Sequence, residues 1–177
     1  MHRKQLLELL SDYNPQDSQE ISIRKDMMDF IQNHSLCFER SLEIGHITAS
    51  AWLINKSGTH ALLTHHAKFN TWLQLGGHCD GDSDVLRVAL KEAREESGIT
   101  HIAPVLETIF DIDIHPIPPP YKCRTHLDIR FLLQVTSDEE YIVSPESKDL
   151  RWISQDITTL PVQSPSLIRM FNKWINI

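Results

Sequence analysis

The chain has 177 residues, of which 41% are hydrophobic and 23% charged, as in an ordinary globular protein with one sizeable core. Its formal net charge of −7 argues against a duplex nucleic acid partner, because phosphate binding needs a basic face, whereas small phosphorylated metabolites bridged by a cation remain compatible. Three separated cysteines without a CxxC pair favour a reducing compartment, and neither a signal peptide nor a long apolar run is visible. We expect a cytoplasmic protein with no membrane partner.

Two helical patterns occupy the first forty residues. Four leucines between Leu6 and Leu10 predict a short helix over residues 3–13, which Asn14-Pro15 ends. Asp17 or Ser18 is expected to begin a second helix that runs to about Asn33. We interpret residues 1–40 as a helical extension, or part of a substrate wall, and residues 41–177 as the core of the same single domain.

A hairpin is expected next. Ile47–Asn55 and Thr59–His65 have strand-like composition, with Lys56-Ser57-Gly58 between them. Residues 69–73 then lead into a glycine-rich segment. Strands that feed a glycine-rich loop and a helix indicate an α/β fold, with the loop at the strand ends where ligands often bind.

The stretch from Gly76 to Ile99 combines a loop and an acidic helix. Three glycines between residues 76 and 82 let the backbone approach a ligand, Asp82 or Ser83 is expected to cap the helix, and Gly98 to end it. Helical spacing places the three acids on the same arc as the apolar positions; the acids are Glu92, Glu95 and Glu96, and the apolar residues are Val85, Val88 and Ala89.

Without a bound ligand, these acids lower the stability of the helix. Carboxylates three and four residues apart repel one another, and the helix macrodipole disfavours anions at this end. A divalent cation would reverse that effect, since Mg²⁺ prefers carboxylate oxygens and keeps waters and substrate phosphates in its other positions. The pattern therefore predicts a magnesium site.

The same stretch resembles the box of the Nudix hydrolase family, G-x5-E-x7-R-E-U-x-E-E-x-G-U, where U is a bulky aliphatic residue. Aligned on Gly77, it matches at Glu92, Ala93, Glu95, Glu96, Gly98 and Ile99. Ser83 stands where the first Glu belongs, and Lys91 where the Arg belongs. Because those two side chains typically pair in the family, we expect a replaced scaffold contact, with Asp82 or Asp84 as a partner for Lys91.

The resemblance implies a Nudix-type α/β/α sandwich with a mixed sheet. It also implies Mg²⁺-dependent cleavage, with Mn²⁺ as a substitute, of a phosphoanhydride bond in a nucleoside diphosphate linked to another moiety or in a related nucleotide. We expect Glu92, Glu95 and Glu96 to bind the metal with the Gly76 carbonyl. Glu146, which precedes Trp152 as a loop acid does in many Nudix enzymes, or one of the box acids Glu92 and Glu95, would prepare the water.

Two further strands, Thr108–Ile114 and His126–Thr136, flank a proline-rich segment predicted to be a surface loop. In the second strand His126, Asp128 and Arg130 share a face. That face is either the polar side of an outer strand or a cleft wall, with Arg130 on a substrate phosphate and Asp128 supporting the metal or a water.

Other side chains leave alternatives open. Trp72 and Tyr121 are candidates for stacking on a base, although aromatic residues near strand ends often belong to the core. Several histidines occur without a regular ligand spacing, so we expect no transition-metal site. Ser164-Pro165 should begin a last amphipathic helix.

Parts of the sequence are also compatible with functions other than hydrolysis. Cys79 suggests a prenyl-diphosphate isomerase, which shares the fold and uses a Cys and a Glu. Ser83 and Lys91 would suit a catalytically weak nucleotide sensor, and an RNA role is disfavoured by charge. The sequence leaves the substrate open, as well as the oligomeric state, a homodimer included.

Overall fold

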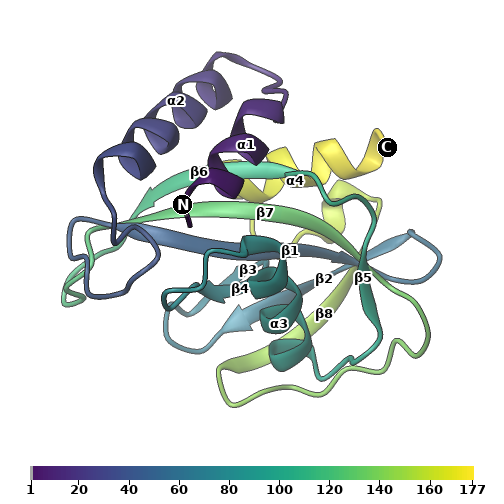
Figure 1. The fold of residues 1–177 in the computed structure, drawn as a ribbon. Helices are drawn as coiled ribbons and strands as arrows, with labels where there is room; N and C mark the ends of the chain where they lie inside the picture. The colour runs from purple at the N-terminus through teal and green to yellow at the C-terminus, as the bar shows by residue number, and fades with distance from the viewer. Residues whose placement is uncertain (1) are drawn as a thin grey trace.

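The computed structural model describes residues 2–177, whose strands form one mixed eight-stranded sheet (Figure 1). The strands follow the order β3-β2-β1-β7-β5, with β4 also paired to β1, β6 to β7 and β8 to β2. Pairing of β1 with β7 is parallel and the other pairings are antiparallel. The strands are β1 (His46–Ile54), β2 (His60–His66), β3 (Thr71–Leu73), β4 (Leu75–His78), β5 (Ile102–Pro104), β6 (Asp111–Pro116), β7 (Thr125–Val135) and β8 (Ser147–Ser154).

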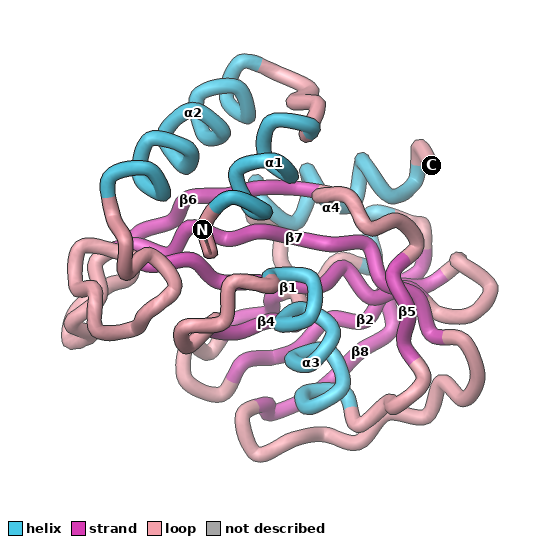
Figure 2. Tube along the Cα trace, in the orientation of Figure 1, coloured by secondary structure: helices cyan, strands magenta, loops and turns pink. Residues whose placement is uncertain are grey.

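Helices cover both faces of this sheet (Figure 2). They are α1 (Lys4–Asp12), α2 (Ser18–Asn33), α3 (Val85–Ser97) and α4 (Pro165–Ile175), with a short 3₁₀ helix η1 (Ile157–Thr159). One face of β1, which includes Ile47 and Leu53, belongs to a core cluster shared with α1, α2 and α3. The opposite face contributes Trp52 and Ile54 to a second cluster with α4. The predicted α/β architecture with a mixed sheet and N-terminal helices is confirmed.

The predicted helix signals correspond to real caps. Asp17 caps α2, accepting a hydrogen bond of 2.8 Å from the Glu20 N–H, and Ser164 caps α4 ahead of Pro165. Gly98 ends α3 in the left-handed conformation, with φ of 72°. The cap of α3 is Asp84, however, and not Asp82 or Ser83 as predicted, so the helix begins at Val85.

Several strands differ from those predicted from the sequence. Leu75–His78, expected to be a glycine-rich loop, is strand β4, and it pairs with β1 from Thr48 to Ala51. The short strand β5 and the strand β8 were not predicted. The interpretation of β7 as an outer strand is wrong, because β1 flanks it on one side and β5 and β6 pair along its other side.

A buried polar contact joins the N-terminal helices to α4. Lys173 donates to the Tyr13 hydroxyl (2.6 Å) and lies 2.9 Å from the buried Glu20 carboxylate. Tyr13 in turn donates to Glu20 (2.6 Å). The two ends of the chain therefore share one charged cluster. No helix among residues 2–177 has the length and apolar character to cross a membrane.

Candidate active site

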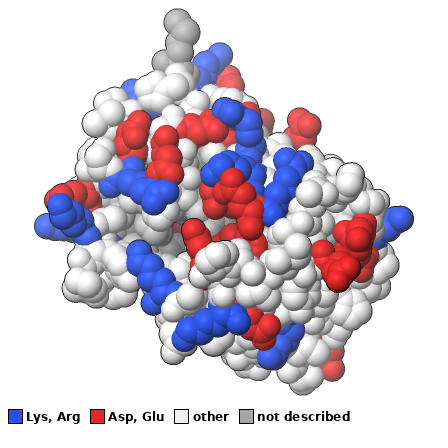
Figure 3. Space-filling view, turned by 90° about the horizontal axis from the view of Figure 1, so that it is seen from below, with Lys and Arg blue, Asp and Glu red and all other residues white. Residues whose placement is uncertain are grey.

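A cavity of about 870 Å³ opens beside the N-terminal part of β1 and the C-terminal half of α3. The face of the molecule in Figure 3 shows a hollow bordered by both acidic and basic side chains. The polar residues that line the cavity come from α3, from strands β1, β2, β4, β6 and β7, and from the loops around them. They are Arg40, His46, Thr48, Ser50, His66, Lys68, Gln74, His78, Asp80, Lys91, Glu92, Glu95, His115, Tyr121, Lys122, Cys123, His126, Asp128 and Glu146.

Asp128 is buried at the wall of this cavity and fully hydrogen-bonded. Its carboxylate accepts from the hydroxyls of Thr48 (2.8 Å) and Ser50 (2.7 Å), from the Gln74 amide (3.0 Å), and from Arg130 (2.7 Å). Burial disfavours its charge, but the Arg130 guanidinium more than compensates and keeps the pKa of Asp128 below its usual range. The residue is thus held as a fixed anion next to the cavity.

Arg130, expected to contact a substrate phosphate, does not line the cavity. Its side chain is 2% exposed and donates to Asp128, Asp111 (2.8 Å), Asp113 (3.1 Å) and the Ser166 hydroxyl (2.7 Å). These contacts occupy all three guanidinium nitrogens, so the residue ties β6 and β7 to the start of α4. A phosphate has no access to Arg130 in this arrangement.

The three acids of α3 have different surroundings. Glu96 is 5% exposed and accepts a hydrogen bond of 2.9 Å from the Gly76 N–H. Burial, with smaller contributions from Glu92 and Glu146, raises the pKa of Glu96 to about 8. Burial also raises the pKa of Glu92, although the Lys91 ammonium opposes the shift. Glu95, by contrast, has a side chain that is 59% exposed.

Lys91 pairs with the box acids themselves. Its ammonium lies 3.1 Å from Glu92 and 3.2 Å from Glu95. The expected pairing with Asp82 or Asp84 is wrong, because both of those carboxylates pair instead with Arg87, at 2.7 Å and 3.5 Å. The Lys91 ammonium, which belongs to α3 itself, therefore occupies a position between two of the acids.

These acids fit a hard divalent cation better than they fit an apolar interior. Glu96 is buried and Glu92 is half-buried; both have raised pKa values, and their only hydrogen-bond donors among residues 2–177 are Lys91 and the Gly76 N–H. Carboxylate oxygens are what Mg²⁺ prefers. The candidate ligands are Glu96, Glu92 and Glu95, of which Glu92 and Glu95 would have to separate from Lys91. The Gly76 carbonyl remains a predicted ligand.

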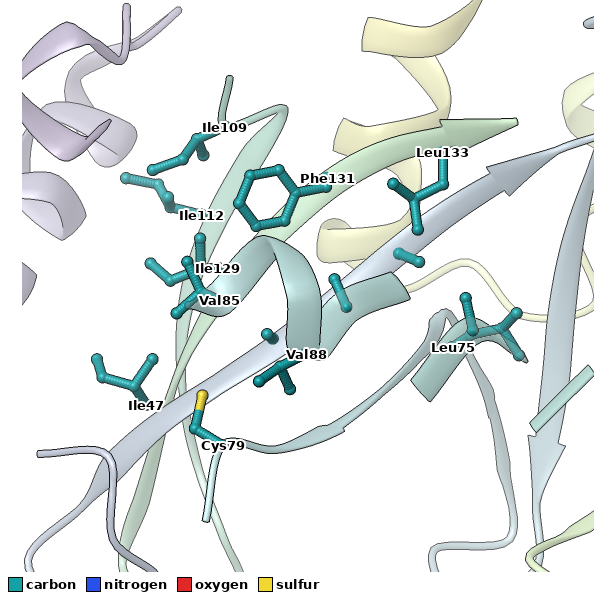
Figure 4. Close-up of a cluster of buried hydrophobic side chains, with 14 of the residues drawn as sticks. Ile47, Leu75, Cys79, Val85, Val88, Ile109, Ile112, Ile129, Phe131 and Leu133 are labelled. Atoms are coloured by element: carbon teal, nitrogen blue, oxygen red, sulfur yellow. The ribbon is translucent and has the colours of Figure 1, made fainter. Parts of the chain in front are cut away.

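Cys79 lies in the apolar core, not in the cavity. Figure 4 shows its sulfur near Val88 and Ile47, and the residue is 4% exposed. Burial raises the pKa of its thiol well above the usual range, which keeps the sulfur protonated and unreactive. Cys79, the residue that suggested a prenyl-diphosphate isomerase, therefore does not support that function.

The mouth of the cavity contains aromatic and basic side chains. Tyr121 lies there, with the Lys68 ammonium 4.0 Å from the centre of its ring and Phe69 edge-on at 5.9 Å. Glu146 also lines the cavity from an exposed loop. Trp72 does not line it, since its ring stacks on His65 and under Arg151.

A histidine cluster in the same cavity was not predicted from the sequence. His46, His78, His115 and His126 come from four different strands, so no regular spacing links them along the chain. The only signal was strand alternation, which places residue 126 on the face of residue 128.

Comparison with known proteins agrees with this geometry. The NUDIX domain model matches residues 45–171, so the chain belongs to the Nudix family, and its class is that of the Nudix-type pyrophosphohydrolases. No curated protein matches the chain.

Solved structures with the same fold include enzymes with different substrates. A Nudix hydrolase from Clostridium perfringens has 22% identity and a TM-score of 0.61, over 74% of this chain and 97% of that one. The Ap4A hydrolase of C. elegans has 16% identity and a TM-score of 0.60, over 73% and 95%. The dihydroneopterin triphosphate pyrophosphohydrolase of E. coli has 12% identity and a TM-score of 0.60, over 74% and 96%. These likenesses show the fold.

Proposed function

We propose that the chain hydrolyses a phosphoanhydride bond in a nucleoside diphosphate linked to another moiety, or in a related nucleotide, with Mg²⁺ as cofactor and Mn²⁺ as a substitute. The observation that supports this proposal best is the position of Glu92 and Glu96. Two mutually repelling carboxylates, that of Glu96 buried and that of Glu92 half-buried, lie beside a cavity that also contains basic side chains. Stability alone does not favour that arrangement, whereas a bound cation and a phosphate chain would.

The residues around the acids suit a pyrophosphate. Arg40, Lys68 and Lys122 line the cavity, and each provides a cation for phosphate oxygens. Arg40 forms a bidentate pair with Asp80, which fixes its guanidinium at the cavity wall. Tyr121, beside Lys68, offers a ring on which a base can stack. Asp128 is held by four donors at the cavity wall, where it would support the metal or a water.

Bound Mg²⁺ would neutralise phosphate charge and lower the pKa of a coordinated water. The chain itself supplies the ligands Glu92, Glu95 and Glu96 and a base for the attacking water. Glu146 is the candidate base that needs no displacement from Lys91, and Glu92 or Glu95 is the other choice. The substrate is a small molecule, and we propose a cytoplasmic setting, no duplex nucleic acid partner and a single domain over residues 1–177.

A catalytically weak nucleotide sensor is the second candidate. It is favoured by one observation: Lys91 pairs with Glu92 and Glu95, where a metal would bind. Such a protein would bind nucleotides without turnover.

The test is a panel of linked nucleoside diphosphates, dinucleoside polyphosphates and nucleoside triphosphates, assayed by chromatography with Mg²⁺ or Mn²⁺. We expect turnover of at least one compound, lost by at least about a hundredfold in Glu96→Gln and Glu92→Gln. Glu107→Gln, an exposed acid away from the cavity, is the matched control. Nucleotide binding without turnover would favour the sensor, and activity that survives both substitutions would refute the metal site.

A further inference from the structure

A row of histidines crosses three neighbouring strands at one end of the cavity. His126 on β7 is the register partner of both His46 on β1 and His115 on β6. Register partners project from the same face of a sheet and bring their side chains together. His78, on β4, completes the cluster from the other side of β1.

The rings are close enough to share one ligand. The ring centroids of His46, His78 and His126 form a triangle with sides of 4.9, 5.0 and 5.1 Å. His115 lies 5.6 Å from His126. Imidazole rings this close together can each offer a nitrogen lone pair to a metal ion that lies between them.

His46 has no satisfactory partner in the protein. The residue is 2% exposed, and neither of its ring nitrogens makes a hydrogen bond of good geometry to any part of residues 2–177, although the Leu42 carbonyl lies near enough to act on the ring. A buried polar group without a partner is costly, and buried polar atoms are nearly always satisfied. The unsatisfied nitrogens of His46 therefore indicate a ligand that binds at this point.

Cys123 adds a sulfur from the proline-rich loop. One nitrogen each from His46 and His126 and the Cys123 sulfur lie within 4.8 Å of one another, and no other trio of His, Cys, Asp or Glu in the described chain does so. A tetrahedral zinc ion with bonds of about 2.0 to 2.3 Å needs ligand atoms roughly 3.5 Å apart. Since no two of these atoms are more than 4.8 Å apart, closing the site requires shifts of at most about 1.3 Å between ligand atoms.

We infer that His46, Cys123 and His126 form a site for a borderline or soft divalent metal, best met by Zn²⁺, with His78 or His115 available as a fourth ligand. Nitrogen and sulfur donors distinguish this site from the oxygen-only acids of α3, which suit Mg²⁺. On binding, the Cys123 thiol gives its proton to solvent and the thiolate coordinates the metal. The metal would then tether the proline-rich loop to β1 and β7 at the edge of the cavity.

The experiment measures Zn²⁺ binding to chelator-treated protein in excess Mg²⁺, by competition with a chromogenic chelator. We expect one Zn²⁺ per chain with a dissociation constant below about 1 μM, weakened at least about tenfold by Cys123→Ser and by His126→Gln. His101→Gln, on an exposed loop, should bind as the wild type does. Glu96→Gln should also leave this stoichiometry unchanged, which separates the site from the acids of α3.

Two measurements on the wild type remain informative if a variant fails to fold. Co²⁺ in place of Zn²⁺ should give a sulfur-to-metal charge-transfer band, and Zn²⁺ should protect Cys123, the one half-buried cysteine, from alkylation mapped by mass spectrometry. Absence of submicromolar binding, binding lost in Glu96→Gln but retained in Cys123→Ser, or a cobalt spectrum without the sulfur band would each overturn the inference.

Discussion

The carboxylate of Glu92 fills the space that a side chain at position 77 would need. A Cβ atom built on Gly77 would lie 2.4 Å from the Oε2 atom of Glu92 and 2.6 Å from its Cδ atom. The Glu92 carboxylate can lie against strand β4 in this position because residue 77 has no side chain. The glycine thus helps to determine where an acid of the proposed metal site lies.

Gly77→Ala should displace Glu92 and impair hydrolysis while the fold persists. We expect the Mg²⁺-dependent rate to fall at least about tenfold, and the free energy of unfolding to fall by about 1–3 kcal/mol from steric overlap. The decisive control is a double-mutant cycle measured by chemical denaturation. In a Glu92→Ala background the Gly77→Ala penalty should shrink below about 0.5 kcal/mol, and a penalty of unchanged size would show that Glu92 is not the cause.

Glu96→Gln should stabilise the metal-free protein at high pH. Because the pKa of Glu96 is raised to about 8, the folded state holds its proton more tightly than the unfolded chain does, and stability is lost as pH rises through that value. Glutamine mimics the neutral form, so the variant should match the wild type near pH 4 and be more stable above pH 8. Denaturation in chelator across this range measures the difference. Equal stability of the variant and the wild type above pH 8 would contradict the argument.

Replacement of Lys91 distinguishes a scaffold contact from a competitor for metal. The ammonium is largely exposed, and exposed ion pairs contribute little. Lys91→Ala should leave the fold intact and change the apparent Mg²⁺ affinity by less than about fivefold, in the direction of tighter binding, since a competing cation is gone. Titration of activity with Mg²⁺ checks this. If affinity or turnover falls more than tenfold and Lys91→Arg restores it, the lysine positions the acids.

The buried charge cluster around Arg130 should make stability depend on acid pH. Burial disfavours the charge of Asp111, but Arg130, Arg169 and Lys173 together hold its pKa below the usual range. Its stabilising effect is therefore present above the unfolded pKa, near 4, and is lost as pH falls further. Asp111→Asn should cost about 3–5 kcal/mol at pH 7 and progressively less below pH 4. Asp26→Asn, on the exposed side of α2, is the control, and an equal cost at all pH values would contradict the argument.

The parts of the fold that local chemistry encodes were predictable from the sequence. Asp17 and Gly98 are helix boundary signals that operate within one turn, and the hairpin of β1 and β2 needs only a short connection. Strand β4 was missed because Gly76 and Gly77 have low strand propensity. The strand forms because its backbone pairs with β1, a contact that no local pattern encodes.

Site residues that lie on one helix were predictable from the sequence, whereas those that paired strands bring together were not. Glu92 and Glu96 follow from helical spacing alone. The surroundings of Arg130 and His46 depend on β1 and β7, which pair in parallel across about eighty residues. Alternation along β7 predicted the shared face of His126, Asp128 and Arg130, but two of the carboxylates around Arg130, those of Asp111 and Asp113, come from β6, and α4 adds the Ser166 hydroxyl.

Helix α4 carries Lys173 and Arg169, which neutralise Glu20 of the second helix and Asp111 of the sheet. If α4 were detached from the sheet, Glu20 would stay buried without a cation, and Asp111 would keep Arg130 alone. Helices α2 and α4 should therefore lose their protection from proteolysis together.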